Sequence, residues 1–276
     1  MFISNTIKTE VVTITPEMAR KLLEQNTRNR KVSNANYATV YEAMTSGEWE
    51  LNGEAIKIAR DGKILDGQHR LLVCAENEIP FQTLIVYGLE SATQDTMDTG
   101  KSRTAADVLA IEGYPSVSNL ATITLGVIRS ERWGLRAATY GSATAYPVTP
   151  RQVLARVKEE PGLVDLSRYA ASLRKCGLSA KIAGILYYHF SKIDADDAQF
   201  FFDTLRDGDG LVRGNPIHTL REHLLALRDN QRGKMNSTYM AAVVIKAWNK
   251  YRLGEECKLL RFRPGGANPE KFPEAV

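Results

Sequence analysis

The decapeptide KILDGQHRLL concentrates residue types that bind or activate phosphate groups. Asp66 can take up a proton or bind a divalent cation, and Gly67 allows a ligand to approach the backbone closely. His69 and Arg70 follow and can donate charge-assisted hydrogen bonds to an anion, Arg70 through its planar guanidinium. Together these residues predict a turn that binds the phosphates of a ligand.

A helix that starts at this turn would complete the binding site, because helix N-termini present unpaired backbone N–H groups and a partial positive charge. The sequence predicts two short strands over residues 54–65 and a helix over residues 68–77. Asp66 then stands either at the helix N-cap or beside a bound phosphate, where its role would be catalytic or metal-binding. The plainer alternative is that Asp66 and Gly67 only cap and turn the chain, with solvated side chains after them.

The stretch ILDGQHRLLVCAEN resembles the signature of the ParB/sulfiredoxin superfamily, whose members carry a DGxHR-like or GGxHR-like turn at the start of a helix. The resemblance covers approximately residues 10–103 and includes the order of the elements before the turn. Members include CTP-binding DNA-segregation proteins, ATP-using sulfiredoxin and small-molecule kinases, and their turn binds nucleotide phosphates. The resemblance implies ATP or CTP with Mg²⁺ as cofactors and Asp66 as a catalytic or metal-binding carboxylate. The phosphate ligands that it implies are Gly67, Gln68, His69 and Arg70.

The chain departs from two branches of this superfamily. Gln68 occupies the variable middle position of the turn, where sulfiredoxin uses a cysteine, so the resemblance does not imply repair of peroxiredoxins. The Gly-Glu-Arg-Arg version typical of chromosomal ParB is also absent, and clamp-type CTP switching is therefore not carried over.

Phosphoryl transfer to a hydroxyl also needs a general base. In kinase-like members of the superfamily a glutamate from the region before the hairpin has this role. Glu54, at the entry to the first predicted strand, is the candidate that we name catalytic beside Asp66. The alternative is that Glu54 is an exposed acid without a function.

A second turn rich in hydrogen-bond donors lies within MDTGKSRTAADVL and has the composition of a further anion contact. Its glycine spacing differs from that of the Walker A motif. An equally good alternative is a helix that ends at Gly100 and a Ser/Thr-capped helix over residues 104–112. As cofactor ligands this turn would supply Thr99, Lys101, Ser102 and Arg103.

The elements that position these residues predict an α+β protein of two domains. Strand and helix signals alternate over residues 1–103, which we expect to form a ParB/sulfiredoxin-like small mixed sheet with helices. Helical periodicity dominates residues 104–276, which we expect to form a mainly helical domain. The helices predicted there span residues 104–112, 117–132, 150–159, 163–175, 179–192, 195–206, 216–229 and 236–253.

The composition is that of an ordinary globular protein, with 43% hydrophobic and 25% charged residues. No apolar run reaches the roughly 20 residues that a membrane span requires, so we expect no membrane partner. The N-terminus lacks the features of a signal peptide, which favours the cytoplasm. The three cysteines are far apart and form neither a zinc motif nor a disulfide framework; they are Cys74, Cys176 and Cys257.

The net charge of +4 permits an anionic partner without requiring one. The end of the chain is basic and has aromatic residues between the basic ones. Such a segment could bind along a nucleic-acid backbone. The alternative is a solvated helix face whose Trp248 lies in a core. The predicted nucleic-acid contacts are Lys246, Lys250, Arg252, Arg261 and Arg263.

Two functions fit these expectations. In the first, the chain binds a nucleoside triphosphate and hydrolyses it or transfers its phosphoryl group to a hydroxyl, such as one on a modified base of nucleic acid. In the second, it is a nucleotide-gated DNA-binding protein in partition or gene control without significant catalysis. The resemblance points to a phage or mobile element as the source, hence to the host cytoplasm, and a homodimer is compatible with the sequence.

Overall fold

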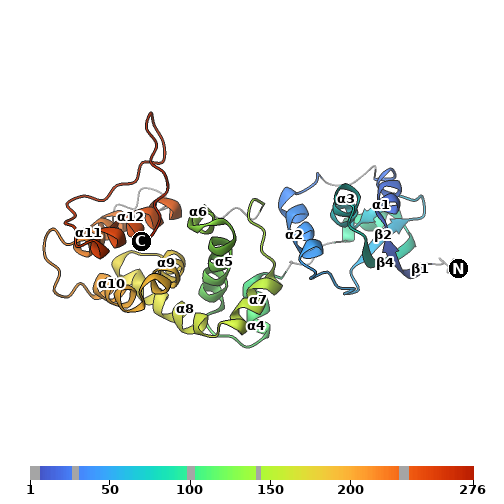
Figure 1. Ribbon diagram of the computed structural model, residues 1–276. Helices are drawn as coiled ribbons and strands as arrows, with labels where there is room; N and C mark the ends of the chain where they lie inside the picture. The colour runs from blue at the N-terminus through green and yellow to red at the C-terminus, as the bar shows by residue number, and fades with distance from the viewer. Residues whose placement is uncertain (1–6, 27–30, 98–102, 141–143, 230–235) are drawn as a thin grey trace. The chain divides into compact units, whose positions relative to one another are not determined.

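The computed structural model describes residues 7–26, 31–97, 103–140, 144–229 and 236–276 (Figure 1). The chain forms two compact units. Unit 1 comprises Met1–Ser102 and Ser142–Thr149, and unit 2 comprises Arg103–Gly141 and Pro150–Val276. The chain therefore returns to unit 1 after the first helices of unit 2.

Unit 1 contains a mixed four-stranded sheet in the order β1-β4-β2-β3. The strands are β1 (Lys8–Ile14), β2 (Ala55–Ala59), β3 (Ile64–Asp66) and β4 (Phe81–Leu89). The β1–β4 and β2–β3 pairs are antiparallel, and β2 runs parallel to β4. This confirms that the fold is α+β with a small mixed sheet.

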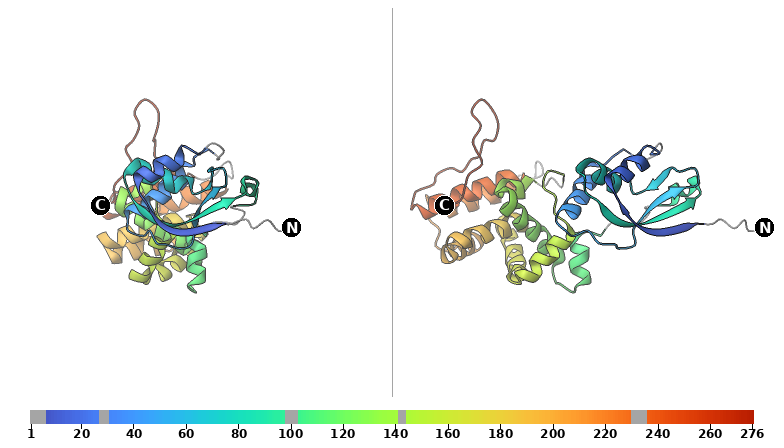
Figure 2. Two further views of the ribbon diagram at one scale, coloured as in Figure 1. Left: turned by 90° about the vertical axis from the view of Figure 1, so that its right-hand side faces the viewer. Right: turned by 45° about the vertical axis from the view of Figure 1, so that its right-hand side comes forward.

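Three helices of unit 1 lie on one side of this sheet (Figure 2). They are α1 (Pro16–Leu23), α2 (Asn34–Thr45) and α3 (Gln68–Asn77), and a short 3₁₀ turn, η1 (Ser91–Thr96), follows β4. Side chains of the strands, including Ile14, Ile56 and Ile85, meet Leu71 and Cys74 of α3 in one buried cluster. Burial of this apolar area fixes α3, and with it the turn that begins α3.

Unit 2 is helical. Its α-helices are α4 (Ala105–Ile111), α5 (Val117–Trp133), α6 (Leu135–Tyr140), α7 (Pro150–Glu159), α8 (Gly162–Ser172), α9 (Ala180–Ile193), α10 (Ala195–Asp207), α11 (Pro216–Asp229) and α12 (Ser237–Arg252), and η2 (Leu173–Cys176) is a 3₁₀ turn. Gly126 of α5 and Gly184 of α9 let these two helices pack closely, because a Cβ on either would lie 2.6 Å or less from an isoleucine of the other. Trp248 of α12 is fully buried and stacks on Phe190 at 4.3 Å, as expected of a core residue.

Among the described residues, none of the helices combines the length and the apolar composition needed to cross a membrane. The three cysteines, which the sequence predicts to be neither paired nor metal-bound, are free and buried.

Candidate functional site

The turn predicted to bind phosphate lies between β3 and α3, and Gly67 alone connects them. Gly67 has φ +102° and ψ 4°, a left-handed conformation in which other residues are strained. A Cβ at this position would lie 2.8 Å from Cγ1 of Ile56 and 3.3 Å from its Cα. Glycine is therefore required twice, for the backbone conformation and for the close approach of the helix start to β2.

Among the described residues, no side chain caps the N-terminus of α3. Its N-cap residue is Gly67, not Asp66, so the alternative in which Asp66 caps the helix does not describe this turn. The Gly67 N–H donates to Oδ1 of Asp66 at 2.7 Å, and the Leu71 N–H makes the first helical hydrogen bond, to the Gly67 carbonyl, at 3.1 Å. The positive end of the helix dipole thus has no side chain at the N-cap to complement it.

The Asp66 carboxylate lies between two cations. Its Oδ2 is 2.9 Å from Nζ of Lys57 and 3.7 Å from Nη2 of Arg70. All three side chains are largely buried, with 18% of Asp66, 27% of Lys57 and 12% of Arg70 exposed. Lys57 and Asp66 are cross-strand partners in the β2–β3 register. The cluster carries one more positive than negative charge, beside the uncapped start of α3.

The Arg70 guanidinium also holds the beginning of β2. Nη1 donates to the carbonyl of Glu54 at 2.7 Å and Nη2 to that of Ala55 at 2.8 Å. The hydroxyl of Thr83 donates to the same Glu54 carbonyl at 3.2 Å. Glu54 is exposed and directly precedes β2, so the structure brings this second catalytic candidate to the motif through its backbone.

His69 links the starts of two helices. Its Nε2 accepts a hydrogen bond from the backbone N–H of Ser33, the N-cap of α2, at 3.1 Å. An accepting Nε2 carries a lone pair, so the imidazole is neutral and its proton is on Nδ1. His69 therefore joins the N-terminal ends of α2 and α3 through a neutral ring.

The second predicted turn is described only in part, because Thr99, Lys101 and Ser102 lie outside the described residues. Arg103 is exposed and directly precedes Thr104, the N-cap of α4 in unit 2. Thr104 and Asp107 form a capping box, with N–H to oxygen distances of 2.8 and 3.2 Å. The alternative reading of a Ser/Thr-capped helix is thereby confirmed for α4.

Two of the predicted nucleic-acid contacts form ion pairs within unit 2. Nζ of Lys246 lies 2.9 Å from Oε1 of Glu270 and donates to the Arg261 carbonyl at 2.7 Å. Nζ of Lys250 lies 2.7 Å from Oε2 of Glu255. These lysines join α12 to the chain that follows it.

Arg252 has a similar role at the end of α12. Its Nη1 forms ion pairs with Asp194, the N-cap of α10, and with Asp197 in the first turn of α10. Arg261 and Arg263 are exposed. Three of the five predicted cations thus have carboxylate partners of their own.

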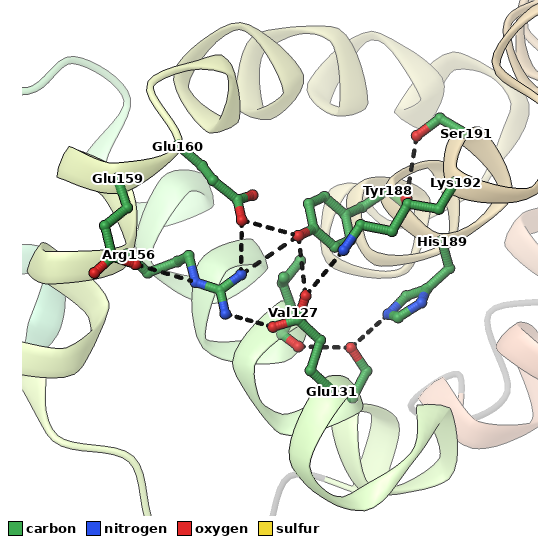
Figure 3. A network of polar contacts seen from close by, with 10 residues as sticks. Val127, Glu131, Arg156, Glu159, Glu160, Tyr188, His189, Ser191 and Lys192 are labelled. Atoms are coloured by element: carbon green, nitrogen blue, oxygen red, sulfur yellow. Dashed lines mark hydrogen bonds and ion pairs between the residues drawn. The ribbon is translucent and has the colours of Figure 1, made fainter.

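A polar network in unit 2 was not predicted (Figure 3). Glu131 of α5 accepts from Arg156 of α7 at 2.5 Å, and from Tyr188 and Lys192 of α9 at 3.0 and 3.1 Å. Burial alone would raise the pKa of Glu131, but the hydrogen bonds from these three partners outweigh it and lower that pKa to about 2. The network ties three helices together, and the contacts join positions 25 to 61 residues apart, which no sequence spacing indicates.

His189 extends this region toward a cavity of about 560 Å³. The cavity is lined by the α5–α6 junction, the end of α9 and residues 272–275. The Ser130 hydroxyl lies 2.7 Å from the Val127 carbonyl and 2.6 Å from Nε2 of His189. Because the Ser130 hydroxyl donates its hydrogen to the Val127 carbonyl, the hydrogen between Oγ of Ser130 and Nε2 of His189 must come from Nε2. Burial lowers the pKa of His189, which favours the neutral ring. The lining combines apolar side chains with the basic Arg136 and Lys192 and the acidic Glu274, and it includes none of the predicted site residues. The residues that line the cavity all belong to unit 2.

No group of three or more His, Cys, Asp or Glu side chains within the described ranges is arranged to hold a metal ion. Comparison of the chain with protein-family models, with curated proteins and with solved structures finds no significant match. The functional argument therefore depends on the geometry of the β3–α3 turn.

Proposed function

We propose that unit 1 is a nucleotide-binding domain of the ParB/sulfiredoxin type and that the β3–α3 turn holds the phosphates of a nucleoside triphosphate. The observation that carries the proposal is Gly67, left-handed at φ +102° and followed at once by an α-helix without a side-chain cap. Backbone amides at such a helix start point toward an anion, and the dipole favours negative charge there. His69 lies at this helix start, where its Nε2 is bonded to the Ser33 N–H, and the Lys57–Asp66–Arg70 cluster adds net positive charge.

The activity that we propose is hydrolysis of the nucleotide or transfer of its phosphoryl group to a hydroxyl. The turn would orient the phosphate chain, which supplies most of the catalysis in phosphoryl transfer. Arg70 and Lys57 are positioning residues, since both hold Asp66 and Arg70 also holds β2. Glu54 is exposed, its backbone carbonyl accepts from Arg70, and it is the candidate that accepts the proton of the hydroxyl.

Mg²⁺ fits this turn through Asp66 only. Mg²⁺ commonly binds one or two carboxylates together with substrate phosphates and water. Asp66 can supply one carboxylate oxygen, although Lys57 already contacts its Oδ2. When bound, the ion would neutralise part of the phosphate charge.

The second candidate, a nucleotide-gated DNA-binding protein without catalysis, has less support. It needs a basic surface in the helical half, and Lys246, Lys250 and Arg252 are each paired with carboxylates. Arg261 and Arg263 are the other two members of the predicted set, and both are exposed. Salt-dependent DNA binding that changes with nucleotide would favour this candidate.

Gln68→Glu separates phosphate binding from folding. Gln68 is the first residue of α3, and an added carboxylate there complements the helix dipole, so the fold should be kept or stabilised by about 0.3–1 kcal/mol. The same charge repels a phosphate bound at that helix start. Gln82→Glu, on an exposed position of β4 and outside the β3–α3 turn, makes the same change of charge and is the matched control.

The experiment is a calorimetric titration of the three proteins with ATP, CTP, GTP and UTP in the presence of Mg²⁺. We expect one nucleotide to bind the parent and Gln82→Glu with the same affinity. We expect its affinity for Gln68→Glu to be at least about tenfold lower than its affinity for the parent. The nucleotide that binds is then the donor in a phosphotransfer screen, in which Glu54→Gln should keep binding and lose turnover. Absence of binding by all four nucleotides, or unchanged affinity in a folded Gln68→Glu protein, would refute the proposal.

A further inference from the structure

Strand β1 is one of the two edge strands of the unit 1 sheet. Within the part of the chain that the structure describes, β1 pairs with β4 alone, and residues 8–11 are exposed. An unpaired edge presents a row of backbone donors and acceptors that can pair with another strand. The side chains at this edge determine which strand can do so.

The exposed part of this edge has the sequence IKTEV, residues 7–11, and it is nearly a palindrome in chemical type. Ile7 and Val11 are large apolar residues with 51% and 52% of their surface exposed. Lys8 and Glu10 carry opposite charges on either side of Thr9. Side chains alternate along a strand, so Ile7, Thr9 and Val11 share one face of the sheet and Lys8 and Glu10 share the other.

We propose that β1 pairs with β1 of a second copy of this chain, antiparallel and centred on Thr9. In this register Lys8 of each copy faces Glu10 of the other, Ile7 faces Val11, and the two Thr9 side chains face each other. Opposite charges, apolar pairs and Thr–Thr pairs are the cross-strand combinations that stabilise antiparallel sheets. The interface is isologous, so the charged pair and the apolar pair each occur twice.

Other registers of the same two strands lack this match. A register centred on Lys8 places two lysines opposite each other, and one centred on Glu10 places two glutamates opposite each other, which is destabilising. Registers centred between residues pair Ile7 with Glu10 or Lys8 with Val11. The alternation of charge therefore favours a single register. The covered face of the sheet does so as well, because a shift by one residue would move every side chain to the opposite face.

The proposed register also places the helix-covered faces of the two sheets on the same side. Val12 and Ile14 of β1 point to the side covered by the helices, because both pack in the core cluster. Lys8 and Glu10 lie on that same side by alternation, and Glu10 lies next to Tyr87 of β4, whose pKa is raised by burial and by this carboxylate. A two-fold axis through Thr9 keeps the helices of both copies on one side and joins the two sheets into one.

Charge reversal tests the register directly. Lys8→Glu places two acids opposite each other at both ends of the interface, and Glu10→Lys places two bases there. Each variant alone should associate with itself at least about tenfold more weakly than the parent does. An equimolar mixture of the two variants restores opposite charges in every pair and should form a heterodimer. Lys21→Glu, on an exposed position of α1, makes the same charge change away from the edge and should dimerise as the parent does.

The measurement is sedimentation velocity over a concentration series, with circular dichroism to verify that each variant is folded. A parent that stays monomeric at every concentration, single variants that dimerise as strongly as the parent, or a mixture that does not associate would each overturn the proposal. This interface does not depend on the proposed nucleotide site, so failure of one leaves the other unaffected.

Discussion

At the residue scale, the candidate site depends on a single glycine. Gly67 combines a left-handed backbone with a close contact to Ile56, so it fixes where α3 begins and how near that helix start lies to β2. The sequence motif predicts a glycine turn, but only the structure shows that Ile56 excludes a side chain there. The two requirements can be measured separately.

Gly67→Ala should lower the free energy of unfolding by about 3 kcal/mol. About 1–2 kcal/mol of this is the cost of a left-handed alanine, and the rest arises from overlap with the fully buried Ile56. Gly62→Ala is the control, because Gly62 has φ +85° and no atom lies within 4 Å of its Cβ position, so only the backbone cost applies. Urea unfolding measures both, and equal losses would show that contact with Ile56 does not matter.

At the element scale, polar contacts fix how helices of unit 2 pack. Glu131, Arg156 and Lys192 lie on α5, α7 and α9 and form a charged network. Removing one of these charges should lower the free energy of unfolding, because the remaining charges are then left without their partner. Periodicity in the sequence predicts most helices of unit 2 within a few residues. It does not predict α6 (Leu135–Tyr140), which is a helix of six residues.

Glu131→Gln should make the stability of the protein less dependent on pH in acid. The folded pKa of Glu131, about 2, is below its ordinary value of 4.5, so its stabilisation is present above about pH 4.5 and is lost as the pH falls toward 2. The pKa difference corresponds to about 3 kcal/mol at neutral pH. The difference in unfolding free energy between parent and Glu131→Gln should therefore shrink over that range.

Glu159→Gln is the control for this prediction. Its carboxylate lies 4.0 Å from Nε of Arg156 and is 72% exposed, so its loss should change stability little at any pH. Thermal unfolding from neutral pH to pH 2 measures both variants. A gap between parent and Glu131→Gln that stays constant with pH would contradict the assignment of the low pKa to Glu131.

At the scale of the whole molecule, the chain crosses between its two compact units more than once. Residues 144–149 belong with unit 1, although helices of unit 2 precede and follow them in sequence. Thr149 is buried, and its hydroxyl donates to Oε2 of Glu48 at 2.6 Å, across 101 positions of sequence. A contact with so large a sequence separation cannot be inferred from local patterns.

Thr149→Val should destabilise unit 1 by about 1.5–3 kcal/mol, because a short hydrogen bond to a carboxylate is lost. Valine keeps the shape of threonine, so the loss reports the hydroxyl. Hydrogen exchange resolved by segment is the measurement, with faster exchange expected in α2, which lies just before Glu48, and unchanged exchange in α9. Equal acceleration in both helices would mean that the segment does not stabilise unit 1 in particular.

The sequence by itself determined the α+β class, the glycine turn between a strand and a helix, and most of the helices of unit 2. These features depend on local rules, namely side-chain periodicity, N-caps and the conformational freedom of glycine. Only the tertiary structure decided the partners of the charged residues: Lys57 for Asp66, the carbonyls of β2 for Arg70, and Asp194 with Asp197 for Arg252. Such partners come from distant parts of the chain, and which of them meet is set by the packing of apolar faces rather than by local sequence.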